Sequence, residues 1–290
     1  MATRSGTGSH HLMATATHRR LRKGVQRRIL SSHGRVVTPY TFCASWRTAA
    51  LRVELYVTPC IVTSPPSECD ALVVPANERL QGTQFTPSEC SQRLAQNTTV
   101  IYPPQCVDGI VTELGGAELA AACASLTSNE LEIRCPTGAA AVTSAFGELR
   151  ACYRHLVHTS PPFYVTEQNP SLASSACWRR LLRSCYHAAF DAAHSVGARH
   201  LAVPLLGSGA RGAPVAASAT VAAEAVSSWR GVRRGRGSCI ESQDSAPALR
   251  VARFGVQHDD AAWAIRDALN KLHPPLRLLA ADMRCGSDWR

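Results

Sequence analysis

The sequence predicts an α/β fold in which helices cover both faces of a central mixed sheet, a three-layer α/β/α sandwich. Short apolar runs of strand length recur along the 290-residue chain. Amphipathic segments of helix length separate them, the clearest at residues 175–196. A glycine-rich turn at residues 207–212 joins an apolar run to an alanine-rich helix. Strands that alternate with helices in this way are typical of sheets with parallel strands.

The individual elements follow from local patterns. Apolar runs predict strands at residues 53–57, 71–75 and 249–256, one strand that ends with residues 156–158 and one that starts at 201, with 71–75 fully buried. Apolar spacing, together with proline and glycine at the ends, predicts helices at residues 115–126, 175–196, 214–228 and 259–272. On the last helix we expect the side chains that face the core to be Trp263, Ile265, Leu269 and Leu272.

These elements place one domain at residues 53–272, between a basic N-terminal extension at 1–52 and a C-terminal tail at 273–290. The proline-containing segment 81–113 is expected to be an irregular insertion. The segment 230–247, rich in Gly, Ser and Arg, is expected to be a mobile loop.

The N-terminal extension has an unusual charge. Residues 1–53 carry ten Arg or Lys and no acidic residue. This composition is typical of transit peptides, which predicts a mitochondrial or plastid location. The alternative is a disordered basic tail on a cytoplasmic or nuclear protein.

Charge and hydropathy limit the partners. Residues 54–290 carry 21 basic and 21 acidic side chains, so the predicted domain is neutral. A nucleic acid is therefore unlikely as the main partner, although a local basic patch stays open. No apolar run reaches 18 residues, which predicts no membrane span. We expect a monomer.

The twelve cysteines do not form a metal-binding pattern. The chain has no C-x-x-C pair and no Cys/His cluster with zinc-finger spacing. Many of the cysteines stand in apolar surroundings, which indicates buried, reduced thiols. We therefore expect no metal, no disulfide framework and no cofactor.

The glycine-rich turn is the strongest indication of a ligand. Glycines at its bends let main-chain N–H groups approach an anion closely, usually a phosphate. The predicted ligand-binding residues are Gly207, Ser208, Gly209, Ala210, Arg211 and Gly212. The G-x-G-x-x-G spacing also fits a dinucleotide fold, with the arginines at 233, 234 and 236 suited to NADP, but few further βαβ units are visible. An ordinary strand–helix turn is the plain alternative.

Several segments together resemble the macro domain family of ADP-ribose-binding modules. Residues 70–77 (DALVVPAN) resemble the family's "DAIVNAAN", residues 115–118 (GGAE) its "GGVD" turn, and residues 204–214 its "PAISTGIYGFP" loop. Between them, residues 135–140 resemble "C-x-T-G-x-A" and residues 155–159 resemble "VIHTVGP". The resemblance covers residues 53–272 and implies the macro domain fold.

The resemblance also implies a ligand and a reaction. The partner would be ADP-ribose or an ADP-ribosylated protein, with the diphosphate between the glycine loop and a second wall at Ala76, Gly115 and Gly116. Asn77 would hold the distal ribose, and Glu118 would activate water or a ribose hydroxyl. The reaction would be hydrolysis of an ester at that ribose, in mono-ADP-ribosyl protein or O-acetyl-ADP-ribose. The alternative is a reader that binds ADP-ribose without turnover.

Each assignment has a plain counterpart, and the chain departs from the family pattern in places. For Asn77 the alternative is a turn that it forms with its own backbone, and for Glu118 it is a favourable interaction with the helix dipole. Cys60 stands where the family has an aspartate that binds adenine, so adenine selectivity stays open. Arg211 replaces an aromatic residue, and it either stacks, pairs with phosphate or lies over the loop in solvent. The insertion at 81–113 enters beside the expected reaction centre.

Overall fold

The computed structural model describes residues 29–30, 36–37, 40–66, 68–83, 106–164, 175–231 and 249–278. The chain divides into two compact units, residues 1–38 and 39–290. In the first unit, β1 (Ile29–Leu30) pairs antiparallel with β2 (Val36–Val37). The elements of the candidate site all belong to the second unit.

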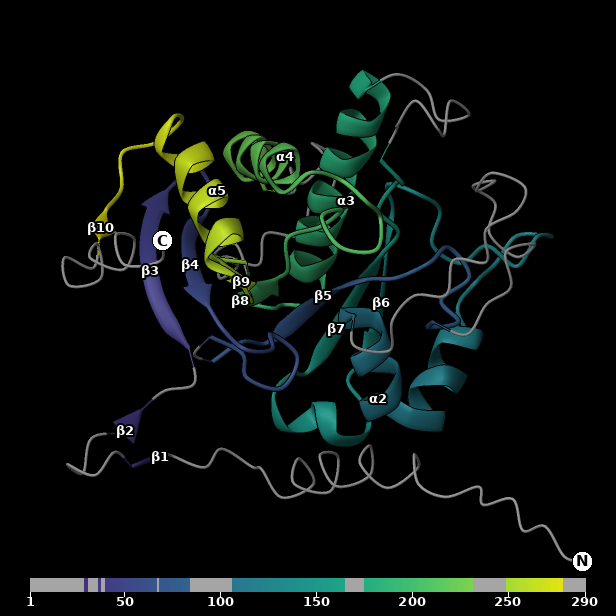
Figure 1. The fold of residues 1–290 in the computed structure, drawn as a ribbon. Helices are drawn as coiled ribbons and strands as arrows, with labels where there is room; N and C mark the ends of the chain where they lie inside the picture. The colour runs from purple at the N-terminus through teal and green to yellow at the C-terminus, as the bar shows by residue number, and fades with distance from the viewer. Residues whose placement is uncertain are drawn as a thin grey trace, which may run out of the picture. The chain divides into compact units, whose positions relative to one another are not determined.

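The second unit is built on an eight-stranded mixed sheet with the order β10-β3-β4-β9-β8-β5-β7-β6 (Figure 1). The strands are β3 (Thr41–Arg47), β4 (Arg52–Val57), β5 (Ala71–Pro75), β6 (Ala140–Ser144), β7 (His155–Thr159), β8 (His200–Val203), β9 (Val251–Val256) and β10 (Arg277–Leu278). The five strands from β4 to β7 in the sheet order run parallel. β3, β6 and β10 pair antiparallel at the two sides.

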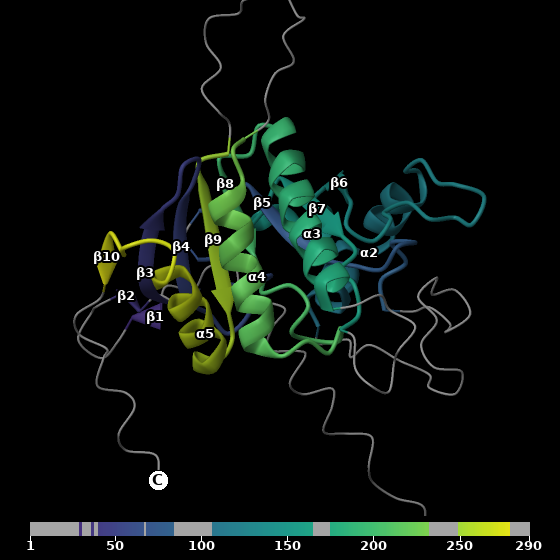
Figure 2. The same ribbon diagram turned by 90° about the horizontal axis from the view of Figure 1, so that it is seen from above.

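Helices cover both faces of this sheet (Figure 2). One face is covered by α3 (Ser175–Ser195), α4 (Val215–Ser228) and α5 (Asp259–Asn270), and the other by α2 (Val107–Ala124). The alternation of side chains along β5 produces the two cores. Val73 packs with the α3 side chains, whereas Leu72 and Val74 pack with Val111 and Leu119 of α2. The predicted three-layer α/β/α sandwich is confirmed.

The sheet extends beyond the predicted range 53–272 on both sides. β3 and β10 lie outside that range, and the sequence analysis missed both strands as well as β6. β3 lies within the predicted N-terminal extension, residues 1–52, but its Ala44 and Trp46 are fully buried in the core. On α5, Ile265 and Leu269 are buried as expected. The prediction for Trp263 and Leu272 was wrong, because these side chains are 46 % and 48 % exposed.

α2 begins earlier than predicted. It starts at Val107 with the Cys106 thiol as its cap, so residues 107–113 of the predicted insertion are helical. Gly115 and Gly116 do not open this helix. Gly116, with φ 60° and ψ −156°, joins two helical segments at a kink. Residues 84–105 of the insertion and 232–247 of the predicted mobile loop lie outside the described residues, as do residues 1–28 of the N-terminal extension.

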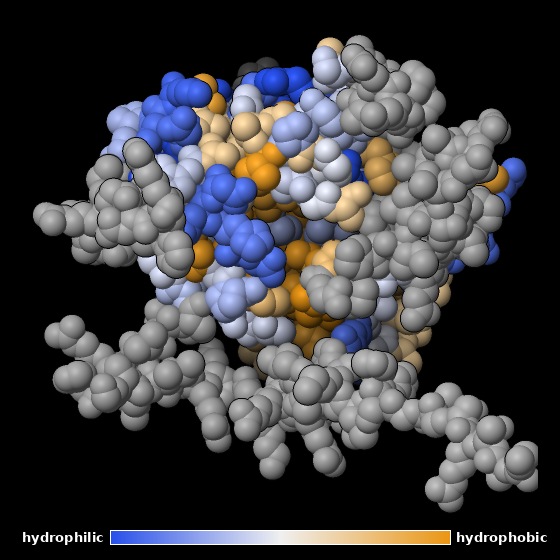
Figure 3. All heavy atoms as spheres, viewed as in Figure 1, coloured by the Kyte–Doolittle hydropathy of each residue, from blue (hydrophilic) through white to orange (hydrophobic). Residues whose placement is uncertain are grey.

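The surface gives no sign of a membrane span in the described part of the chain. No helix there is both long and apolar enough to cross a bilayer. The face seen in Figure 1 carries hydrophobic residues down its middle, with hydrophilic ones beside them (Figure 3).

Candidate functional site

The candidate site lies at the carboxyl ends of the parallel strands, where α/β proteins bind ligands. β5 ends beside Ala76, and β8 is followed by the glycine loop, residues 204–214. The Arg211 guanidinium donates to the Ala76 carbonyl oxygen at 2.9 Å, which ties the loop to the end of β5. Ala76 and Gly116 line one cavity. The three segments chosen from the sequence therefore meet in space.

The glycine loop offers hydrogen-bond donors. Among the residues that the structure describes, the main-chain N–H groups of Gly207, Ser208, Gly209 and Ala210 have no acceptor. Gly207 has φ 89°, a conformation that favours glycine. α4 starts directly after the loop, and its N-cap Pro214 provides no side-chain cap. Unpaired amides beside a helix N-terminus form a favourable place for an anion.

Arg211 does not lie over the loop in solvent. Its guanidinium stacks over the Phe163 ring, 4.3 Å from the ring centroid, while it donates to Ala76. Its carbonyl oxygen accepts the Tyr164 N–H at 2.9 Å. The side chain is therefore held at the junction of the glycine loop, the end of β5 and the segment after β7.

A cavity of about 270 Å³ opens between the turn after β5 and α2. Its lining includes Ala76, Leu80 and Gly82 from the turn, Asp108, Gly116 and Cys123 from α2, and His158 from β7. The lining also includes the polar residues Arg79, Gln81, Thr112 and Arg134. Asp108 and His158 are polar residues of the lining that are buried.

Asp108 is the functional candidate that the sequence analysis missed. Its side chain, in the first turn of α2, is only 7 % exposed and accepts no hydrogen bond from a described residue. Burial raises the pKa of this carboxyl to about 7, and the nearby positive charge of Arg211 limits the rise. A carboxyl that titrates near neutral pH is suited to proton transfer. The signal was the dipeptide at 107–108, which reproduces the "VD" of the "GGVD" turn.

The structure does not bring Glu118 into this cavity. Its side chain is 64 % exposed and pairs with Arg150 at 3.9 Å. Gly116 lines the cavity, whereas Gly115 is buried against the Leu119 side chain. Residues 115–118 resembled the "GGVD" motif because of their two glycines, but the acid in this segment, Glu118, is an exposed residue paired with Arg150.

Asn77 has the geometry of the plain alternative, a turn former. Its Nδ2 donates to the Gly82 carbonyl at 2.6 Å, and its Oδ1 accepts the N–H groups of Arg79 at 3.1 Å and Gln81 at 3.3 Å. These bonds fix the turn that forms one wall of the cavity. Asn77 thus shapes the site through the backbone.

His158 is a buried residue of the sheet. Its Nε2 lies 2.9 Å from Thr143 Oγ1 and 4.0 Å from Cys123 Sγ. Burial lowers the pKa of His158 to about 4 and raises that of the Cys123 thiol to about 11. Both groups are neutral at pH 7, so they do not form an activated nucleophile pair.

The remaining sequence assignments are simpler. Cys60 is half-buried in the loop after β4 and brings no carboxylate to that position. In the described part of the chain no three His, Cys, Asp or Glu side chains gather to hold a metal ion. The nine described cysteines are all free thiols.

The fold and this site define an α/β/α domain with main-chain amides that have no acceptor among the described residues, and with a buried carboxyl, at its strand ends. A sequence model of the Macro domain matches residues 74–222, half of the chain. The chain belongs to the macro domain family.

Curated relatives are similar over part of their length. A macro domain-containing protein of Streptomyces griseus is 35 % identical over 120 residues, which cover 41 % of this chain and 62 % of the relative. One of Streptomyces coelicolor is 33 % identical over 124 residues, 43 % of this chain and 67 % of the relative. The chain thus spans about three fifths of the length of the first of these relatives.

Solved structures share the fold. A mutant of the Oceanobacillus iheyensis macrodomain with ADPR has a TM-score of 0.55 at 20 % identity, over 80 % of this chain and 98 % of that one. The same macrodomain with ADP has a TM-score of 0.55 at 19 % identity, over 80 % and 97 %.

Proposed function

We propose that this macro domain binds ADP-ribose or a derivative of it, with the diphosphate on the glycine loop and the distal ribose toward Asp108. The observation that carries the proposal is that two sets of polar groups without partners among the described residues lie at the same strand ends. They are the main-chain amides of residues 207–210 and the buried carboxyl of Asp108. The hydrogen bond from Arg211 to the Ala76 carbonyl holds the glycine loop against the end of β5. The amides suit two phosphates, and the carboxyl requires a donor such as a ribose hydroxyl.

The proposed reaction is hydrolysis of an ester at the distal ribose, in mono-ADP-ribosyl protein or O-acetyl-ADP-ribose. Asp108 takes the role that the sequence analysis gave to Glu118. Its carboxylate accepts a proton from water or from a ribose hydroxyl, and a pKa of about 7 lets it return that proton. Asn77 positions the turn beside the reacting group. The scheme needs no metal or cofactor.

Binding is tested first. Calorimetry with ADP-ribose, ADP and NADP is expected to give the tightest binding for ADP-ribose, because only this ligand has both the diphosphate and the free distal ribose. The variant Gly207→Ala is expected to weaken all three ligands, since it strains a loop residue with φ 89°. Tighter binding of NADP than of ADP-ribose would end this proposal.

Turnover is tested next, with a mono-ADP-ribosylated protein and O-acetyl-ADP-ribose as substrates. We expect Asp108→Asn to lose about two orders of magnitude in rate or more, as is usual when a general base is removed. Glu118→Gln is the matched control on the same helix and is expected to keep full activity, because that side chain is exposed and paired with Arg150. Equal loss in both variants would contradict the assignment.

A reader without turnover is the second candidate. The observation in its favour is that both polar atoms of the Asn77 side chain are engaged within the turn, so this residue is not available to orient water. ADP-ribose binding with no release from either substrate would support the reader.

A further inference from the structure

The edge of the sheet opposite the glycine loop carries a row of arginines. The parallel strands begin there, and β4 starts with Arg52. Arg250, Arg199 and Arg154 stand directly before β9, β8 and β7. Arg47 ends the antiparallel strand β3 and pairs in register with Arg52. All five side chains are exposed, and we call them the arginine rim.

Backbone hydrogen bonds fix the order of the rim. The Arg52 N–H donates to the Arg250 carbonyl at 2.9 Å, and the Arg250 N–H donates to the Arg199 carbonyl at 2.9 Å. Next in the row is Asp70, whose carboxylate accepts the Arg199 N–H at 2.8 Å and whose carbonyl accepts the Arg154 N–H at 2.8 Å. The rim therefore crosses six neighbouring strands. At about 4.8 Å between strands it is about 24 Å long.

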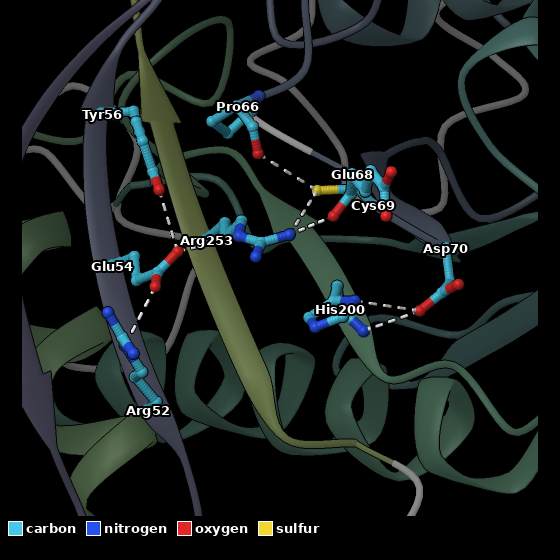
Figure 4. A network of polar contacts seen from close by, with 9 residues as sticks. All are labelled: Arg52, Glu54, Tyr56, Pro66, Glu68, Cys69, Asp70, His200 and Arg253. Atoms are coloured by element: carbon cyan, nitrogen blue, oxygen red, sulfur yellow. Dashed lines mark hydrogen bonds and ion pairs between the residues drawn. The ribbon is translucent and has the colours of Figure 1, made fainter.

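Two carboxylates near the rim, Glu54 and Asp70, are engaged inside the protein, while Glu68, two residues before Asp70, is exposed (Figure 4). Glu54 pairs with Arg52 at 2.9 Å and with Arg253 at 2.8 Å, and it accepts the Tyr56 hydroxyl. Asp70 Oδ2 accepts the main-chain N–H groups of Arg199 and His200. These two acids are thus held by donors of the sheet itself.

The rim itself keeps positive charge available. Arg47, Arg154, Arg199 and Arg250 make no hydrogen bond or ion pair through their guanidinium groups with any residue that the structure describes. Of the five rim arginines, Arg52 alone has a carboxylate partner in that part of the chain. Four unpaired guanidinium groups along one edge create a positive stripe.

The chemistry of the rim favours phosphates. A guanidinium binds phosphate through two parallel hydrogen bonds. Among the described residues at this edge, the exposed large apolar side chain is Leu276, directly before β10 and beside β3. A single leucine at one end of the row is a small anchor for a lipid bilayer beside five arginines. One strand of a nucleic acid duplex presents about seven phosphates over 24 Å, at 3.4 Å each.

We propose that the arginine rim binds the phosphate backbone of a nucleic acid without reading its sequence. The surface lies at the other end of the parallel strands from the candidate site and does not depend on the proposed function. Backbone contacts of this kind position a nucleic acid but carry no sequence information.

The test measures salt dependence with the full chain and a fluorescent 20-base-pair duplex of mixed sequence, between 50 and 200 mM NaCl. The triple variant Arg154→Gln, Arg199→Gln, Arg250→Gln removes three phosphate contacts. The slope of log affinity against log salt is expected to become shallower by about 2.7, at 0.9 per phosphate. Lowering the salt fourfold then strengthens the wild type about 40-fold more than the variant. The basic N-terminal extension is present in both proteins, so its contribution cancels.

The matched control removes the same charge from the first half of α3, through Arg179→Gln, Arg180→Gln and Arg183→Gln. These side chains are exposed, and Leu182 among them packs near Gly207, at the end of the sheet opposite the rim. Arg179 also pairs with Glu224. The slope of this control is expected to equal that of the wild type. An unchanged slope in the rim variant, or an equal change in both variants, overturns the proposal. The proposal is also overturned if the rim variant loses binding to phosphatidylserine vesicles but keeps its binding to the duplex, because that result assigns the rim to membranes. Each single rim variant is expected to change the slope by about 0.9, a check that does not need the triple variant to be stable.

Discussion

Replacing Asp108 by asparagine should stabilise the protein at alkaline pH. The folded chain holds the proton of this carboxyl up to a pKa of about 7, against 3.8 for an exposed aspartate. Between these values the folded state binds more protons than the unfolded state, so the free energy of unfolding falls as the pH rises from about 4 to about 7. Three pKa units correspond to about 4 kcal/mol, which the wild type loses in full above pH 7.

Asparagine keeps the shape of the side chain and does not ionise, so the variant avoids this loss. We expect Asp108→Asn to match the wild type near pH 4 and to exceed it by up to about 4 kcal/mol at pH 8. For a domain of this size that is a rise of about 10 °C in Tm. Urea and thermal denaturation at pH 4, 6 and 8 measure the difference, with the exposed Glu118→Gln as control. If Asp108→Asn is no more stable than the wild type at pH 8, the carboxyl is not desolvated and the proton-transfer argument fails.

Three further predictions concern the surroundings of the site and the sheet. Arg211→Met removes the positive charge that lowers the pKa of Asp108, so the midpoint of the Asp108 carboxyl titration, followed by carbon NMR, should move above 7. An unchanged midpoint would show that the charge of Arg211 does not act on this carboxyl. Gly207→Ala should cost about 1–3 kcal/mol in urea denaturation because of its φ of 89°, while Gly209→Ala, where the added Cβ meets open space, should cost less. Glu54→Gln should cost about 3 kcal/mol, since it leaves a buried guanidinium without its counter-charge. Burial pushes the pKa of Glu54 up, but hydrogen bonds and charges hold it below 4.5, so its stabilisation is present above that pH and is lost on acidification; titration of unfolding below pH 4.5 should show a fall that the variant lacks.

Local sequence patterns predicted the parts of the fold that depend on neighbours in the chain. The strand at 71–75 has the predicted bounds, because a continuous apolar run of this length between polar residues is typical of a strand buried on both faces of a sheet. The glycine loop was found in the same way. β3 was missed because its core side chains, Ala44 and Trp46, are separated by a polar residue and follow a long basic segment.

Motif matching in the sequence did not identify the correct candidate acid. Glu118 and Asp108 both stand on α2. Glu118 follows the glycine pair of the "GGVD" motif, and Asp108 follows the valine of the same motif. The sequence could not show that one side chain is exposed beside Arg150 while the other is buried. That difference depends on which face of α2 packs on the sheet, and the kink at Gly116 changes this face within the helix.

By itself, the sequence determined the α/β sandwich and the glycine-rich turn between a strand and a helix, because glycines and apolar runs act through local backbone geometry. Only the tertiary structure decided where charge resides. Burial and Arg211, which is about a hundred residues away in the chain, together set the pKa of Asp108. The arginine rim is assembled from Arg52, Arg154, Arg199 and Arg250, which meet because parallel strands begin at the same edge. Electrostatic energies depend on distances in space and on exclusion of water, and neither is written in the order of residues along a chain.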